Sequence, residues 1–189
     1  ASKFVESGWS VKAMHRLIMA SATYQQVSTV TAKRAKRDPD NALLSRMPLT
    51  KLDAEALRDA FLFVAGQLDE KNRGGKPDGI KNRADGLVSI PRGANGWRRS
   101  IYVQQRRTEM PTFLTTFDLP RMEPNCIERP QSTVAPQALH LLNDATVHEI
   151  AGHFAERVLK EAGDETAQLS RAHWLAFSRA PSKAELQLT

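Results

Sequence analysis

The clearest structural signal in this chain of 189 residues lies at residues 50–68, TKLDAEALRDAFLFVAGQL. Its apolar side chains recur at steps of three and four residues, which is the spacing of one face of an α-helix. The run Thr50-Lys51-Leu52-Asp53 resembles a capping box with Asp in place of Glu, so we expect the helix to begin there and Leu49 to pack on its first turn. The face expected to be buried holds Leu57, Ala60, Phe61, Val64 and Leu68.

The same spacing predicts helices on both sides of this one. Residues 10–26 form an amphipathic pattern with Ser10 as the N-cap. Residues 28–48 indicate a long polar connection with one helical turn around Leu43-Leu44. Toward the C-terminus, the expected helices are 111–117 opened by Pro111, 133–162 with Thr133 as N-cap and a kink or restart at Asn143-Asp144, 166–177, and a last one opened by the capping box Ser182-Lys183-Ala184-Glu185.

A glycine-rich stretch separates these two groups of helices. Residues 69–97 contain six glycines together with Pro77 and Pro91, a composition that no helix tolerates, so a long Gly-rich loop is expected. Residues 99–104 are rich in β-branched and aromatic side chains and predict a strand. We expect this strand to pair with residues 87–90 in a small hairpin.

The fold class expected from these patterns is mainly α. It is an irregular helical bundle with a small two-stranded β-hairpin and a long Gly-rich loop. The length fits a single domain. Because the last capping box opens a helix with no room before Thr189, and the chain enters abruptly at Phe4-Val5, we expect residues 1–189 to be a single-domain fragment that is truncated at both ends.

The basic charge of the chain is local. The net charge is +6, and residues 71–107 alone hold ten basic and two acidic residues. A basic stripe suits nucleic acid, an anionic polysaccharide or a membrane surface, and it can also be a solvated loop. Binding of single-stranded nucleic acid uses interleaved aromatic side chains, and only Trp97 and Tyr102 interleave here. Nucleic acid is therefore a disfavoured partner.

Composition excludes several classes of protein. A hydrophobic content of 41% is too high for a wholly disordered chain. No run of about 18 apolar residues predicts a transmembrane segment, and residues 1–6 show no signal-peptide pattern. One cysteine, Cys126, cannot form an internal disulfide, a four-Cys zinc site or a haem c attachment motif. Cys126 is expected in a loop as a free or buried thiol, or paired with a cysteine outside these residues.

The histidines give no metal-ligand spacing. His148 and His153 lie five residues apart, whereas the metalloprotease motif needs four, and on a helix their side chains diverge by roughly 140°. We therefore expect no metal site, and no cofactor within these residues.

Polar and charged side chains gather between residues 98 and 143, around predicted turns and element ends. Arginine paired with aspartate can grip an anionic or sugar ligand, and it can equally form an internal network that anchors loops. The internal network is the favoured interpretation. The candidate ligand-binding residues are Arg98, Arg99, Tyr102, Arg106, Arg107, Asp118, Arg129, Thr133, Gln137 and Asn143.

A series of motifs in this order resembles a known family. The motifs are Gly8-Trp9-Ser10-Val11-Lys12-Ala13-Met14-His15-Arg16-Leu17-Ile18, Asn41-Ala42-Leu43-Leu44-Ser45-Arg46, Leu52-Asp53-Ala54-Glu55-Ala56-Leu57-Arg58-Asp59-Ala60, Arg98-Arg99-Ser100-Ile101-Tyr102, Phe117-Asp118, Ser132-Thr133 and Pro136-Gln137-Ala138-Leu139-His140-Leu141-Leu142-Asn143. Together they resemble the planctomycete-type family catalogued as domain of unknown function 1553.

The resemblance implies a setting rather than an activity. Members similar to this chain are large exported bacterial proteins, periplasmic or beyond, that often carry a cytochrome-c-like domain and are linked to polysaccharide use. Haem c would then lie in another domain of the full-length protein, and the other domains of the polypeptide are expected partners. The resemblance carries over no catalytic residue.

Three functions are compatible with these observations. The first is an accessory helical module of an exported multidomain protein, serving haem-linked electron transfer or polysaccharide use, with an anionic polysaccharide as a candidate partner. The second is an enzyme domain that acts on a sugar or sulfated glycan through the Arg, Asp and Tyr cluster. The third is nucleic-acid binding through residues 71–107.

Overall fold

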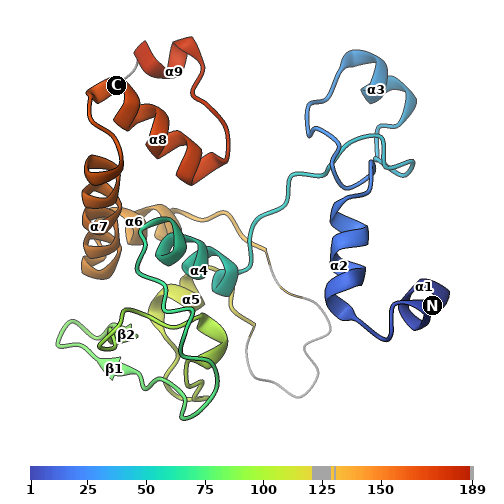
Figure 1. Cartoon of the computed structure of the whole chain (residues 1–189). Coiled ribbons are helices and arrows are strands. Elements are labelled where there is room, and N and C mark those ends of the chain that lie inside the picture. Colours follow the sequence, from blue (N-terminus) through green and yellow to red (C-terminus); the bar gives the residue numbers. More distant parts are fainter. Residues whose placement is uncertain (121–128, 130, 188–189) are drawn as a thin grey trace. The chain divides into compact units, whose positions relative to one another are not determined.

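The computed structural model describes residues 1–120, 129 and 131–187 (Figure 1). The chain divides into two compact units, Ala1–Lys51 and Leu52–Thr189, and each is described by itself. The predicted fold class is confirmed, because the described residues are mostly helical and include a small two-stranded antiparallel sheet. The expectation of a single truncated domain stays a prediction.

The first unit contains three short helices, α1 (Ser2–Glu6), α2 (Val11–Met19) and α3 (Ala32–Arg37). The predicted N-cap of α2 is confirmed, because the Ser10 hydroxyl accepts a hydrogen bond of 3.2 Å from the Ala13 N–H. The helical turn expected around Leu43-Leu44 was misplaced. The helix of this region is instead α3, which lies in the basic run and is capped by the hydroxyl of Thr31.

The second unit holds the remaining elements. They are α4 (Ala54–Val64), β1 (Lys81–Asn82), β2 (Val88–Ser89), a 3₁₀ helix (Ser100–Tyr102), α5 (Thr112–Thr116), α6 (Ala135–Asn143), α7 (Ala145–Glu161), α8 (Glu165–Phe177) and α9 (Lys183–Gln187). In the sheet, Lys81 pairs with Ser89 and Asn82 with Val88. None of the helices in the described part of the chain is long and apolar enough to cross a membrane.

The start of α4 differs from the prediction. Asp53 is the N-cap and Ala54 the first helical residue, so the capping box expected at Thr50 is wrong. Leu49 is 88% exposed and does not staple the first turn. Asp53 has non-helical backbone angles, and its carbonyl accepts the first intrahelical hydrogen bond from the Leu57 N–H at 2.8 Å, while its side chain makes no capping hydrogen bond.

The buried face of α4 is offset from the predicted one. Ala54, Arg58, Leu62 and Ala65 point into the unit, while Phe61 and Leu68 pack at the margin of the core. Leu57, Ala60 and Val64 are only partly buried. The prediction used only the spacing of apolar residues, and it placed the buried face on the adjacent stripe of the helix because the observed face contains a buried arginine.

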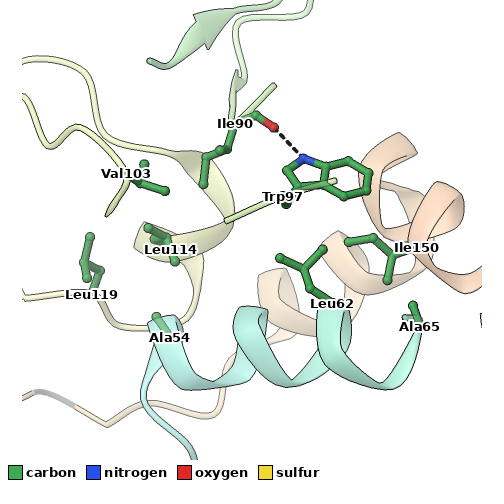
Figure 2. Close-up of a cluster of buried hydrophobic side chains, with 9 residues drawn as sticks. All are labelled: Ala54, Leu62, Ala65, Ile90, Trp97, Val103, Leu114, Leu119 and Ile150. Carbon is green, nitrogen blue, oxygen red and sulfur yellow. Dashed lines mark hydrogen bonds between the residues drawn. The ribbon is translucent and has the colours of Figure 1, made fainter. Parts of the chain in front are cut away.

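The core joins α4 to segments that are distant in the sequence. One buried cluster contains Leu62 of α4, Ala65 at the C-cap of α4, Ile150 of α7, Leu114 of α5 and Trp97 (Figure 2). The indole Nε1 of Trp97 donates to the Ile90 carbonyl at 3.0 Å, which satisfies the one polar atom of a buried aromatic side chain.

Backbone contacts between elements complete this packing. Arg157 of α7 donates to the carbonyls of Val64 at 2.8 Å and Phe63 at 3.1 Å, so it caps the C-terminal end of α4. The Val88 N–H of β2 donates to the hydroxyl of Thr112 at 2.8 Å. The hairpin and α7 are therefore both tied to the α4–α5 core.

The strand predicted over residues 99–104 is wrong. Residues Ser100–Tyr102 form a 3₁₀ helix, and the partner of β2 is Lys81–Asn82. Val103 makes only an isolated parallel bridge with Asp78. The polar groups of Ser100 bind the side chain of Asp59, so this segment takes its hydrogen bonds from a helix rather than from a neighbouring strand.

The C-terminal helices follow the sequence more closely. The short helix after Pro111 and the helix predicted at 166–177 are confirmed as α5 and α8. The predicted restart is confirmed, because the Asp144 carboxylate caps α7 by accepting from the N–H groups of Thr146 and Val147.

Two predicted helix starts in this region had different outcomes. Thr133 as an N-cap is wrong, because α6 begins after Val134 with Pro136 in its first turn. The capping box at Ser182 is confirmed, because the Ser182 N–H donates to Glu185 at 2.7 Å and the Glu185 N–H to the Ser182 hydroxyl at 3.3 Å. Cys126 lies outside the described residues.

Gly96 allows the backbone beside Trp97 to approach residue 67. Its φ is +111°, and a Cβ there would lie 2.4 Å from the Gln67 carbonyl oxygen. Gly96→Ala is therefore expected to destabilise the fold by more than the about 1–3 kcal/mol of a strained backbone alone. Urea denaturation of the full chain measures this change.

Two other glycines serve as controls, which separate the effect of a positive φ from the effect of the close approach. Gly74→Ala tests a positive φ of +81° with no atom within 4 Å of the new Cβ, and Gly79→Ala tests neither feature. We expect the loss of stability to fall in the order Gly96, Gly74, Gly79. An equal loss for Gly96→Ala and Gly74→Ala would show that the close approach does not matter.

Candidate functional site

Helix α4 presents two adjacent charged residues, Arg58 and Asp59, to residues 98–100. Arg58 is 6% exposed, and its Nη1 donates to the Arg98 carbonyl at 3.2 Å and the Ser100 hydroxyl at 3.1 Å. The Asp59 Oδ1 accepts from the N–H and the hydroxyl of Ser100, both at 2.7 Å. Its Oδ2 accepts from the Arg99 Nε at 3.2 Å. We call this arrangement the α4 clasp.

The α4 clasp was not predicted from the sequence. The available signal was the Arg58-Asp59 pair inside an otherwise apolar helical stripe. Burial lowers the pKa of Arg58 to about 10, while the neighbouring Asp59 and Asp78 oppose this effect. Because that pKa is still far above neutral pH, α4 carries a buried cation.

Arg98 continues the network away from α4. Its Nε and Nη2 donate to the Asp78 Oδ1 at 2.9 and 2.7 Å, and its Nη1 and Nη2 donate to the carbonyls of Gly74 at 2.7 Å and Lys76 at 2.6 Å. The guanidinium also lies over the Tyr102 ring, 5.0 Å from its centroid. The hydrogen bond to Asp78 raises the pKa of Arg98. Arg98 and Tyr102 therefore hold the Gly-rich loop in place.

A cleft opens between the two loops that this network shapes. It has a volume of about 440 Å³, and its lining residues come from the segments 69–78 and 93–98 and include Lys71, Arg73 and Lys76. Lys71 and Lys76 make no side-chain hydrogen bond or ion pair within the part of the chain that the structure describes, and Arg73 donates only to the Glu70 carbonyl. These three cations are exposed. We call this feature the basic cleft.

The acidic groups of the basic cleft are engaged internally. Asp78 binds Arg98, and the Asp69 carboxylate accepts from the Lys71 N–H at 3.0 Å and from the N–H and side-chain amide of Asn72. The Asn72 side chain holds the pKa of Asp69 below its ordinary value, so this carboxyl stays ionised. Four cations and two carboxylates line the cleft, which leaves it positively charged.

A second network contains two more of the predicted residues. The Asp118 carboxylate accepts from the N–H and hydroxyl of Ser132, both at 2.7 Å. The Gln137 amide donates to the Thr116 carbonyl and the Ser132 hydroxyl, both at 3.1 Å. These bonds join the end of α5 to the chain before α6, so the role shown for Asp118 and Gln137 is to anchor the backbone.

The remaining candidates have separate surroundings. Arg129 forms a bidentate pair with Glu55 at 2.8 and 3.1 Å, Arg106 binds Glu109, and Asn143 donates to the Leu139 carbonyl. Arg107 and Thr133 are exposed. Of the candidates predicted from the sequence, only Arg98 lines the basic cleft. Tyr102 lies under the Arg98 guanidinium, and Arg99 binds Asp59 in the α4 clasp. Lys71, Arg73 and Lys76 were noted in the sequence as charge and not as site residues.

The described residues contain no group of three or more His, Cys, Asp or Glu side chains that could hold a metal ion. His148 contacts the Leu142 carbonyl at 2.8 Å, and His153 contacts Glu156 at 3.3 Å. These two side chains thus have different partners.

The fold and the cleft define a class of protein, namely a mainly helical module in which buried and half-buried arginines shape a basic cleft. The chain belongs to the family PSD1, described as "Protein of unknown function (DUF1553)", whose model matches residues 1–189. The family resemblance drawn from the motifs is thereby confirmed. No curated protein and no solved structure matches the chain.

Asp59 supplies the negative charge beside the buried Arg58, so removing this charge is expected to lower the free energy of unfolding. Asp59→Asn keeps the shape of the side chain but leaves the Arg58 cation without this neighbour, and we expect a loss of about 3 kcal/mol in the free energy of unfolding. Chemical denaturation checks this value.

The matched control is Asp53→Asn at the start of the same helix. The Asp53 side chain is 52% exposed and lies 3.8 Å from Arg129, so its loss should be below about 1 kcal/mol. Equal losses for the two variants would contradict the role assigned to the α4 clasp.

Proposed function

We propose that this chain is a noncatalytic helical module that binds an anionic polysaccharide, such as a sulfated glycan, through the basic cleft. This proposal rests on the observation that some cations bond within the fold whereas others have no acidic partner. Arg58 and Arg98 are used by the fold, whereas Lys71, Arg73 and Lys76 surround an open space and have no acidic partner within the described residues. Exposed, unpaired cations around a cleft attract anions.

The shape of the cleft favours an extended polar ligand. Its walls come from two loops, and Gly74, Gly75 and Gly93 place backbone without side chains along the lining. A polysaccharide can approach such a wall closely and use backbone groups as well as the cations. A cleft of about 440 Å³ lies within the range typical of sites for small molecules, so it has room for a short part of a chain.

The carboxylates argue for binding rather than hydrolysis. Glycoside hydrolysis uses a carboxylic acid whose pKa is raised so that it can protonate the leaving group. The pKa of Asp69 is instead lowered, and Asp78 is held by two nitrogen atoms of Arg98. We therefore rank the noncatalytic module above the enzyme domain.

The wider setting rests on the family resemblance. It supports an exported bacterial multidomain protein, with the other domains as partners and any haem c in one of them. An accessory role in polysaccharide use accords with the basic cleft, whereas the role in haem-linked electron transfer stays a prediction.

The test uses dextran sulfate as the probe and uncharged dextran as its control. The variant Lys71→Gln/Arg73→Gln/Lys76→Gln removes the three unpaired cations. Because each exposed charge contact contributes about 0.2–1 kcal/mol, we expect the Kd for dextran sulfate to rise about tenfold. Isothermal titration calorimetry at constant ionic strength measures this change, and thermal denaturation checks that the fold is retained.

The control variant Lys81→Gln/Lys160→Gln/Lys183→Gln removes the same charge from exposed positions outside the cleft. Its affinity should change less than threefold. If both variants lose affinity equally, binding follows net charge and the cleft is not the site. If duplex DNA binds more tightly than dextran sulfate and loses affinity in the same cleft variant, the partner is nucleic acid and the proposal fails.

A further inference from the structure

A second, smaller cavity lies inside the Leu52–Thr189 unit, separate in its lining from the basic cleft. Its volume is about 40 Å³, and its walls come from α4, the β1–β2 hairpin region, the start of α5, His140 of α6 and the first turns of α7. Most of the lining is apolar, including Phe61, Leu62 and Val147. Sites between packed helices are common places for small ligands.

The cavity carries an incompletely compensated cation. Arg58 lines it, and only its Nη1 makes hydrogen bonds with the described residues. The nearest carboxylate oxygen, the Asp59 Oδ1, lies 3.7 Å from that nitrogen and already accepts two hydrogen bonds from Ser100. A guanidinium has five N–H donors, so Arg58 retains donors for a further acceptor.

His140 adds a polar atom without a partner. Its Nε2 is buried and makes no hydrogen bond, although His140 also lines the cavity. The ring is held edge-on to Phe113 and Phe117, with centroid distances of 5.7 and 6.4 Å. A buried nitrogen without a partner costs free energy, which a ligand in the cavity would recover.

The other charged residues of the lining already bind one another. Arg83 donates to the Asp144 Oδ2 at 3.1 Å and also pairs at 2.7 Å with Asp85, which lies outside the lining. The N–H groups of Thr146 and Val147, which line the same space, donate to the Asp144 carboxylate. Of the two lining arginines, Arg58 is therefore the one that makes no hydrogen bond to a carboxylate.

We infer that this cavity is a binding site for a small inorganic monovalent anion of the halide class, held between Arg58 and the Nε2–H of His140. The volume sets the class of ligand. About 40 Å³ has room for one or two water molecules or one small ion, and it is too small for a sugar or a phosphate ester. The site differs in lining and ligand from the basic cleft.

Chloride is the probe in solution and bromide in crystals. The chain is titrated with NaCl, and the linewidth of the ³⁵Cl NMR signal is followed. If chloride binds in the cavity, the broadening caused by the protein should saturate as the site fills. His140→Phe keeps an aromatic ring against Phe113 and removes Nε2, so chloride affinity should fall at least about tenfold. Crystals grown in NaBr should show a bromine anomalous peak in the cavity.

His173→Phe is the matched control, because His173 also has a buried ring nitrogen without a partner and packs on Phe177, yet does not line the cavity. It should bind chloride as the unaltered chain does. The inference is overturned if broadening never saturates, if both variants lose it equally, or if the cavity holds only water in NaBr crystals. The crystal experiment decides the matter if His140→Phe does not fold.

Discussion

The buried guanidinium of Arg58, next to Asp59 on α4, is the constraint on which the rest of the second unit depends. Removing a charged group from water is unfavourable unless hydrogen bonds and a nearby opposite charge offset the cost. Here Asp59 supplies the opposite charge, and the hydrogen bonds go to Arg98 and Ser100, about forty residues further along the chain. These contacts fix that segment in one place. Arg98 can then reach the Gly-rich loop, and Trp97 can enter the core.

Apolar packing and the polar network therefore share one helix. The face of α4 that buries Leu62 and Ala65 also buries Arg58, and Trp97 joins the core immediately before Arg98 joins the loop. The 440 Å³ cleft and the 40 Å³ cavity lie in reach of this network, with Arg98 lining the first and Arg58 the second. A change in the α4 clasp is consequently expected to alter both spaces.

The structure also changes which cations are candidates for binding. In the sequence, Arg98, Arg99 and Tyr102 stand out because arginine, aspartate and tyrosine are typical of sugar and anion sites. Arg98 donates four hydrogen bonds to the Gly-rich loop, so the cations of the basic cleft that could still bind a ligand are Lys71, Arg73 and Lys76. The interpretation of the Arg and Asp residues as an internal network is supported by these contacts.

The sequence by itself determined the local features of this protein. The N-cap at Ser10, the restart at Asp144 and the capping box at Ser182 depend on residues within a few positions of one another, and they formed as predicted. The caps expected at Thr50 and Thr133 did not form, because α4 and α6 begin further along the chain. Only the tertiary structure decided that Arg58 is buried, that residues 100–102 form a 3₁₀ helix rather than a strand, and that the cleft lies between two loops. The reason is physical. Each of these features depends on hydrogen bonds or packing between residues that are about twenty to forty positions apart, and such partners cannot be identified from the spacing of nearby side chains.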